Sequence, residues 1–156
     1  MLAWGRHAIL QYLCNVYGQA QPHWYPREAR QRARIDCYLH WHHANTRSCA
    51  TYTFSKVLGP RMGMPSSERA LQRAEGAVRA ALDGLENVFL ASTPFIFAEH
   101  PSIADLSAYE EVLSLHALAK WDLAGHRRVT AWMARMQQLP HHADVHAILE
   151  KLRARL

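Results

Sequence analysis

The sequence predicts an all-α fold, a bundle of about five to six helices in a chain of 156 residues. Proline and glycine gather in short clusters such as "YGQAQPHWYP" and "LGPRMGMPSS". The stretches between these clusters are long and rich in Ala, Leu, Arg and Glu, which favour helices. Apolar residues recur there at steps of three or four, and no stretch keeps the strict alternation of a half-buried strand.

Two helices are predicted in the first part of the chain. Gly18 ends a helix over about residues 7–17. Pro26 suits the first turn of a helix, and the helix that begins there is predicted to reach about Val57. This second helix is the longest and contains a histidine-rich segment.

Four further helices follow. A serine, Ser66 or Ser67, caps the third helix, in which apolar residues recur with helical spacing at Leu71, Ala74, Val78, Ala81, Leu82, Leu85, Val88 and Phe89. The remaining three are predicted over about residues 103–120, 129–138 and 143–156. In the fifth, "VTAWMARM" places its large apolar side chains on one face, which indicates core packing.

Composition and charge limit the class of protein. No apolar stretch is as long as a membrane span, and no small-residue cleavage site follows "MLAWGRHAILQYL", so we expect a cytoplasmic protein without a membrane partner. Cys14, Cys37 and Cys49 lie far apart, without the C-x-x-C spacing of a zinc site. The net charge of +5 comes mainly from arginines with the spacing of solvated helix faces. We therefore expect no nucleic-acid partner.

The segment "HPSIADLSAYEE" holds a serine and an aspartate that suggest either catalysis or helix capping. Ser102 follows a proline that cannot lie inside a helix, and Asp105 stands at the third helical position. This spacing is that of a capping box, with Asp in place of the commoner Glu. A serine nucleophile would instead need a positioned base, which the sequence does not show. We interpret Ser102 and Asp105 as structural capping residues, and predict no catalytic residue here.

The segment "RIDCYLHWHHANTR" allows two interpretations. At helical spacing Asp36, His40, His43 and Arg47 form one polar stripe, which is typical of solvated surface. The alternative is a pocket wall, because an arginine ending the stripe can hold an anionic or electrophilic ligand group. The histidine spacing does not match the i, i+4 pattern of zinc ligands.

The pair His142 and His146 does have i, i+4 spacing. A metal site needs a third ligand from another segment, and the sequence offers no clear candidate. We therefore expect capping or surface roles for these histidines and no metal.

Five segments together resemble the theta class of glutathione S-transferases. They occur in the family's order and approximate spacing, and they are "HWYP", "RARIDCYLHWHHANTR", "KVLGPRMGMP", "PSIADLSAYEE" and "HAILEK". The resemblance implies the family's all-helical C-terminal domain over residues 19–156. It also implies that Arg47 faces a hydrophobic electrophile as substrate. His40 and His43 share the stripe of Arg47 and are predicted to bind substrate beside it.

The family's thioredoxin-like N-terminal domain, which binds glutathione and carries the catalytic serine, is missing from this sequence. The stretch "GRHAILQYL" resembles the last helix of that domain, so residues 1–18 are interpreted as its remnant. Gly5 and Arg6 stand where the family has the glutamate and serine that hold the γ-glutamyl group. We expect no bound cofactor, and glutathione is a co-substrate only if a complete enzyme exists.

Two functions remain open as expectations. The first is a glutathione S-transferase-like protein that is inactive alone because the glutathione site is absent. The alternative is a non-catalytic protein-interaction or ligand-binding module, because removing a covering domain exposes apolar surface. Its partner would be a second copy of the chain or the missing thioredoxin-like domain. The "AILQYL" helix, with Tyr38 and Trp41, is the candidate surface.

Overall fold

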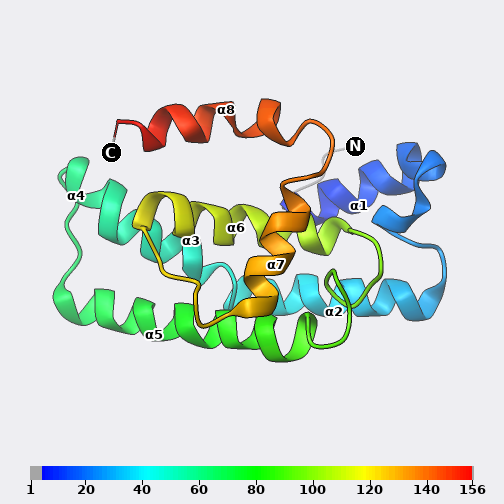
Figure 1. Ribbon diagram of the computed structural model, residues 1–156, viewed down its shortest axis with the longest axis horizontal. Helices are drawn as coiled ribbons and strands as arrows, with labels where there is room; N and C mark the ends of the chain where they lie inside the picture. The colour runs from blue at the N-terminus through cyan, green and yellow to red at the C-terminus, as the bar shows by residue number, and fades with distance from the viewer. Residues whose placement is uncertain (1–4, 156) are drawn as a thin grey trace.

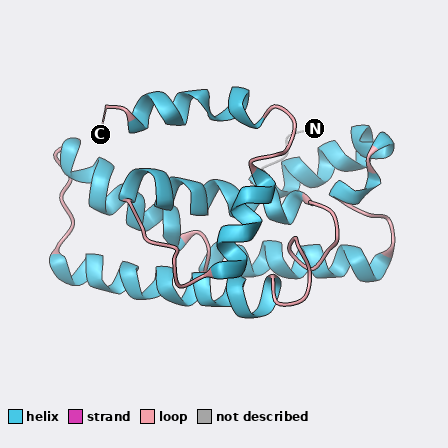
Figure 2. Ribbon diagram, in the orientation of Figure 1, coloured by secondary structure: helices cyan, strands magenta, loops and turns pink. Residues whose placement is uncertain are grey.

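The computed structural model describes residues 5–155, apart from the side chain of Gln19, and its regular elements are all helical (Figures 1 and 2). The main helices are α1 (Arg6–Tyr17), α2 (Ala29–Ala44), α3 (Ser48–Thr53), α4 (Gly59–Arg61), α5 (Glu68–Gly84), α6 (Ile103–Ala119), α7 (Arg127–Met136) and α8 (His142–Arg153). Short turns of tighter or wider helix are η1 (Gly18–Ala20), η2 (Pro22–Trp24), η3 (Phe54–Leu58) and η4 (Leu85–Phe89). The all-α prediction is confirmed. Residues 1–4 of the interpreted remnant (1–18) and residue 156 of the last predicted helix (143–156) lie outside the described residues.

Helix α6 is the centre of the molecule. It lies between α5 on one side and α8 on the other, and α7 crosses it (Figure 1). Of its 17 residues, 13 are buried. The largest fully buried side chains around it include Tyr38 from α2, Leu82 from α5 and Trp132 from α7. The predicted core role of the "VTAWMARM" helix is confirmed, because its large apolar residues are buried.

The predicted long helix from Pro26 to Val57 is wrong at its start. Helix α2 begins at Ala29, because the carboxylate of Glu28 accepts hydrogen bonds from the backbone N–H groups of Arg30 and Gln31, both at 2.8 Å. A side-chain acceptor at this position satisfies amides that have no partner within the helix.

The predicted long helix is also broken in its middle. The backbone leaves the helix at Asn45, with φ −124° and ψ −83°, and helical structure resumes at Ser48 in α3. Within the break, the hydroxyl of Thr46 accepts a hydrogen bond from the buried Tyr38 hydroxyl at 3.0 Å. The break redirects the chain so that α3 packs against α6.

Ser102 and Asp105 form the hydrogen bonds of a capping box at the start of α6. The Ser102 hydroxyl accepts from the backbone N–H of Ala104 at 3.2 Å, and the Asp105 carboxylate accepts from the backbone N–H of Ser102 at 2.8 Å. Both residues are fully buried. Asp105 also accepts from the backbone N–H of Ile96 at 2.9 Å and from Trp132 Nε1 at 3.0 Å, so it joins α6 to a loop and to α7.

Helix α8 lies at the edge of the molecule and has no fully buried residue. Two of its histidines make polar contacts with α6: His142 Nε2 lies 2.7 Å from the Tyr109 hydroxyl, and His146 Nε2 lies 3.1 Å from Glu110 Oε1. No described helix combines the length and the apolar character that a transmembrane segment requires.

Candidate functional site

An apolar pocket of about 390 Å³ lies between α3, the turn η3 and α6. The break after α2 creates it, because it allows α3 to cross α6 and places Arg47 at the edge of the pocket. The other residues that line it are Ala50, Thr51, Thr53, Phe54, Leu58, Ser114 and Leu118. A mostly apolar cavity with one cation suits a small hydrophobic molecule that carries an anionic or electron-rich group.

A buried ionic cluster lies beside this pocket. Glu111 on α6 is only 2% exposed, and its Oε1 accepts from Arg6 Nη2 at 2.7 Å and from Arg47 Nη1 at 2.9 Å. The same oxygen lies 3.7 Å from His42 Nε2, and Arg6 also contacts His42. Burial by itself raises the pKa of Glu111, but the hydrogen bonds from His42 and the two arginines outweigh it and lower the pKa to about 2. Glu111 is therefore ionised at physiological pH.

His7 extends this cluster towards α1. Its ring centroid lies 5.0 Å from that of His42 and 4.6 Å from that of His43. Burial is the largest cause that lowers the pKa of His7 to about 4, and repulsion from the neighbouring histidines and Arg6 adds to it. His7 Nε2 is buried without a hydrogen-bond partner among the described residues. His7 is therefore neutral at pH 7.

The structure places Arg47 at the pocket but does not bring His40 and His43 into it. Both histidines are exposed on α2, and neither lines the pocket. The predicted stripe ends with the helix at Ala44, and the break turns Arg47 towards α6. The opposite side of this segment faces the core, since Ile35, Tyr38, Leu39, His42 and Thr46 are buried. A substrate-binding role for Arg47, His40 and His43 stays a prediction.

Sequence reasoning missed Glu111 and the role of Arg6. A signal for Glu111 was available: it lies seven residues after Ala104 and four before Leu115, both fully buried, so helical spacing places it on a buried face. A carboxylate at such a position predicts a cationic partner. No sequence pattern identifies Arg6 as that partner, because α1 and α6 meet only through tertiary packing.

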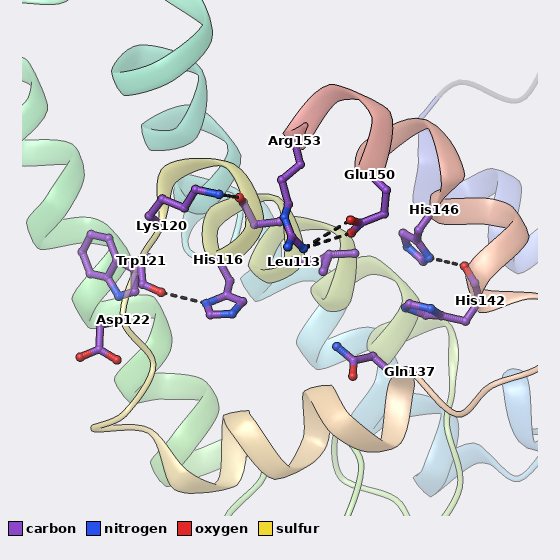
Figure 3. Close-up of a pocket in the computed structure, with 11 residues that line it drawn as sticks. Leu113, His116, Lys120, Trp121, Asp122, Gln137, His142, His146, Glu150 and Arg153 are labelled. Atoms are coloured by element: carbon purple, nitrogen blue, oxygen red, sulfur yellow. Dashed lines mark hydrogen bonds and ion pairs between the residues drawn. The ribbon is translucent and has the colours of Figure 1, made fainter. Parts of the chain in front are cut away.

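A second cavity of about 470 Å³ lies under α8, between α6 and α7 (Figure 3). Several polar groups around it already pair with neighbouring groups. His116 Nδ1 lies 2.9 Å from the carbonyl oxygen of Trp121, and Arg153 Nη1 lies 3.3 Å from the carboxylate of Glu150. In Figure 3 the His142 and His146 rings lie together at the other end of the cavity. These polar groups of the cavity therefore already have partners within the protein.

The histidines of α8 do not assemble a metal site. His142 contacts Tyr109, and His146 contacts Glu110 and its own helix. Within residues 5–155, no group of three or more His, Cys, Asp or Glu side chains is placed to hold a metal ion.

Comparison with known proteins identifies related sequences. A family model described as glutathione S-transferase, C-terminal domain, matches residues 68–135, from the start of α5 to the end of α7. Glutathione S-transferase T1 of Arabidopsis thaliana is 36% identical over 94% of this chain. The match covers 64% of that relative.

Solved structures of human theta-class enzymes share the fold. Human glutathione transferase theta-2, in complex with glutathione and an unknown ligand, superposes with a TM-score of 0.88 and 30% identity, covering 99% of this chain and 65% of that one. A human theta-class enzyme in complex with the glutathione conjugate of 1-menaphthyl sulfate has a TM-score of 0.82 and 32% identity, with 97% and 65% covered. The chain thus spans less than two thirds of the length of these relatives.

Proposed function

We propose, from the premise that this chain is homologous to the C-terminal helical domain of theta-class glutathione S-transferases, that it binds hydrophobic electrophiles in the pocket beside Arg47. The observation that carries the proposal is the single guanidinium at the edge of an otherwise mostly apolar pocket. The relative bound to a conjugate of 1-menaphthyl sulfate supports the substrate class, an aromatic body with an anionic group.

Binding of naphthalene derivatives tests this proposal. We expect the chain to bind 1-naphthalenesulfonate more tightly than the neutral 1-naphthalenemethanol, because Arg47 pairs with the sulfonate. The variant Arg47→Ala should lose this preference. The control variant Arg73→Ala should keep it, because Arg73 is an exposed residue of α5 that does not line the pocket. Equal affinity of the unmodified chain for both compounds, measured by calorimetry, would overturn the proposal.

Conjugation is a separate part of the proposal. We expect residues 1–156 alone to give only the background rate with glutathione and 1-chloro-2,4-dinitrobenzene. The described residues form no β-strand, so they contain no thioredoxin-like sheet of the kind that binds glutathione in the family. Glutathione is then a co-substrate only of a protein that also contains a thioredoxin-like domain. Turnover clearly above background would contradict this expectation.

A second candidate function is protein interaction through α1. One face of this helix exposes apolar side chains with helical spacing, namely Ile9, Tyr12, Leu13, Val16 and Tyr17. Contiguous exposed apolar surface marks interaction sites. Tyr38 and Trp41 do not extend this surface, because Tyr38 is fully buried and Trp41 packs on Phe89 and against Gly84.

Solution mass distinguishes the two functions. If α1 mediates self-association, the chain is dimeric by light scattering, and Leu13→Glu makes it monomeric. Val145→Glu is the matched control, since Val145 is an exposed apolar residue on α8. A monomer in the unmodified chain that binds no hydrophobic dye would count against an interaction surface.

A further inference from the structure

Glu111 is a fixed negative charge beneath the pocket edge. It comes from the middle of α6, is almost fully buried, and uses one oxygen, Oε1, for both Arg6 and Arg47. Its second oxygen, Oε2, is buried and has no hydrogen-bond partner among the described residues. A carboxylate is costly to bury unless cations pair with it, so Glu111 and the arginines depend on one another.

The guanidinium of Arg47 is paired with Glu111 through one nitrogen, and the rest of it is accessible. Its side chain is 54% exposed, and Nη1 donates to Glu111 at 2.9 Å. A guanidinium has more N–H donors than one carboxylate oxygen can use. Among residues 5–155, Glu111 is the only partner seen for the Arg47 guanidinium, so its other donors remain available at the pocket edge.

We propose that Glu111 is a positioning residue that holds the Arg47 guanidinium at the pocket edge, ready to pair with the anionic group of a hydrophobic ligand. The inference rests on the proposed function of the pocket. An unpaired arginine side chain samples many rotamers. If it is already fixed before the ligand binds, less side-chain conformational entropy is lost on binding. Glu111 acts only through Arg47, because its own carboxylate is buried.

The charge of the cluster allows this role. Arg6 and Arg47 contribute two positive charges against the single negative charge of Glu111. Burial lowers the pKa of His42, so this ring adds no charge at neutral pH. The cluster therefore keeps one net positive charge and still attracts an anion. If Arg47 alone neutralised Glu111, the pair would have no charge left for the ligand.

The variant Glu111→Gln distinguishes positioning from simple electrostatics. Gln keeps the shape but removes a negative charge near the anion site. Electrostatics alone predicts tighter binding of 1-naphthalenesulfonate, because repulsion is removed. Positioning predicts weaker binding, by about tenfold, the size expected for loss of one well-oriented charged hydrogen bond. Binding of the neutral 1-naphthalenemethanol should be unchanged. Glu110→Gln, on the exposed neighbouring position, is the matched control.

A double-mutant cycle identifies the residue through which Glu111 acts. In the Arg47→Ala background, Glu111→Gln should no longer weaken sulfonate binding, because the loss of positioning passes through Arg47. In parallel, the Nε–Hε signal of Arg47 in NMR spectra should be sharp in the unmodified chain and exchange-broadened in Glu111→Gln. A role limited to fold stability would leave both the ligand preference and this signal unchanged.

Failure of the positioning role and failure of the proposed function give different results. If the unmodified chain shows no preference for the sulfonate, both fall. If it does and Arg47→Ala abolishes that preference, but Glu111→Gln binds equally or more tightly, positioning alone is wrong. Circular dichroism checks folding. Should Glu111→Gln fail to fold, Glu111→Asp keeps the charge on a shorter side chain, and unchanged sulfonate affinity there would overturn the proposal.

Discussion

At the scale of single residues, the buried carboxylate of Asp105 has the widest structural effect. It accepts from the backbone of Ile96 and Ser102, from the Ser102 hydroxyl at 3.0 Å and from Trp132 Nε1. Burial raises the pKa of Asp105 to about 6 despite these donors. The residue therefore does more than cap α6, because it also fixes a loop and α7 to that helix.

Replacing Asp105→Ala should lower the free energy of unfolding by about 3 kcal/mol or more, because four donors are left buried without an acceptor. Asp144→Ala is the control, since Asp144 lies in the first turn of α8 with an exposed side chain. Urea denaturation measures both. A cost for Asp105→Ala no larger than that for Asp144→Ala would show that the network contributes nothing beyond a cap.

His7 gives the protein a predictable response to acid. Its pKa is about 4 in the folded chain, against 6.5 for an unperturbed histidine, so the unfolded chain binds a proton first as pH falls. Its contribution to stability is complete above pH 6.5 and is lost progressively between pH 6.5 and 4. In His7→Leu this loss is removed. We expect the stability advantage of the variant over the unmodified chain to grow as pH falls through this window, and parallel curves in chemical denaturation would contradict the assignment.

The sequence allows some of the roles of these residues to be predicted, but not all of them. Ser102 and Asp105 are recognisable because a capping box is a local pattern that depends only on spacing along the chain. The bonds from Asp105 to Ile96 and Trp132 are tertiary and have no local pattern. The same holds for Arg6 and Arg47, which meet on Glu111 only because α1 and α3 both pack against α6.

At the scale of elements, helix starts and ends are largely predictable, and interruptions inside a helix are not. Ser67 caps α5 through its hydroxyl, as one of the two predicted serines, and α6 ends at Ala119, one residue before the predicted end. The break after Ala44 contains neither proline nor glycine, so the two strongest signals of a helix end are absent. It is stabilised by the buried contact between Tyr38 and Thr46, a contact that helical propensity does not describe.

Two glycines on α5 test how closely that helix packs. A Cβ added at Gly84 would lie 2.8 Å from Trp41 Cζ2, whereas one at Gly76 would meet no atom within 4 Å. Gly76→Ala should stabilise the protein by about 0.5–1 kcal/mol through helix propensity alone. Gly84→Ala should instead destabilise it, by about 1–3 kcal/mol after the same gain is offset by overpacking. Thermal unfolding of the two variants measures this, and stabilisation by both would mean that Trp41 moves freely.

At the scale of the whole molecule, stability is concentrated around α6 and falls off towards α8. Helix α6 is in contact with α2, α3 and α7 and is buried over most of its length. Helix α8 has no fully buried residue and exposes Val145 and Ile148. Local unfolding requires the least free energy where few apolar groups are buried, so α8 should detach while the rest of the bundle stays folded.

Hydrogen exchange tests this division of stability. The backbone amides of α8 should exchange many times faster than those of α6 after correction for intrinsic rates, because their protection reflects local opening and that of α6 reflects global unfolding. Burial, with repulsion from His146, lowers the pKa of His142, so below pH 6.5 protonation of His142 favours the detached helix and the protection of α8 should fall further. His142→Gln removes this pH dependence while it keeps a polar group near Tyr109. Equal protection of α8 and α6 would mean that the bundle unfolds as one cooperative unit and that the edge position of α8 does not weaken it.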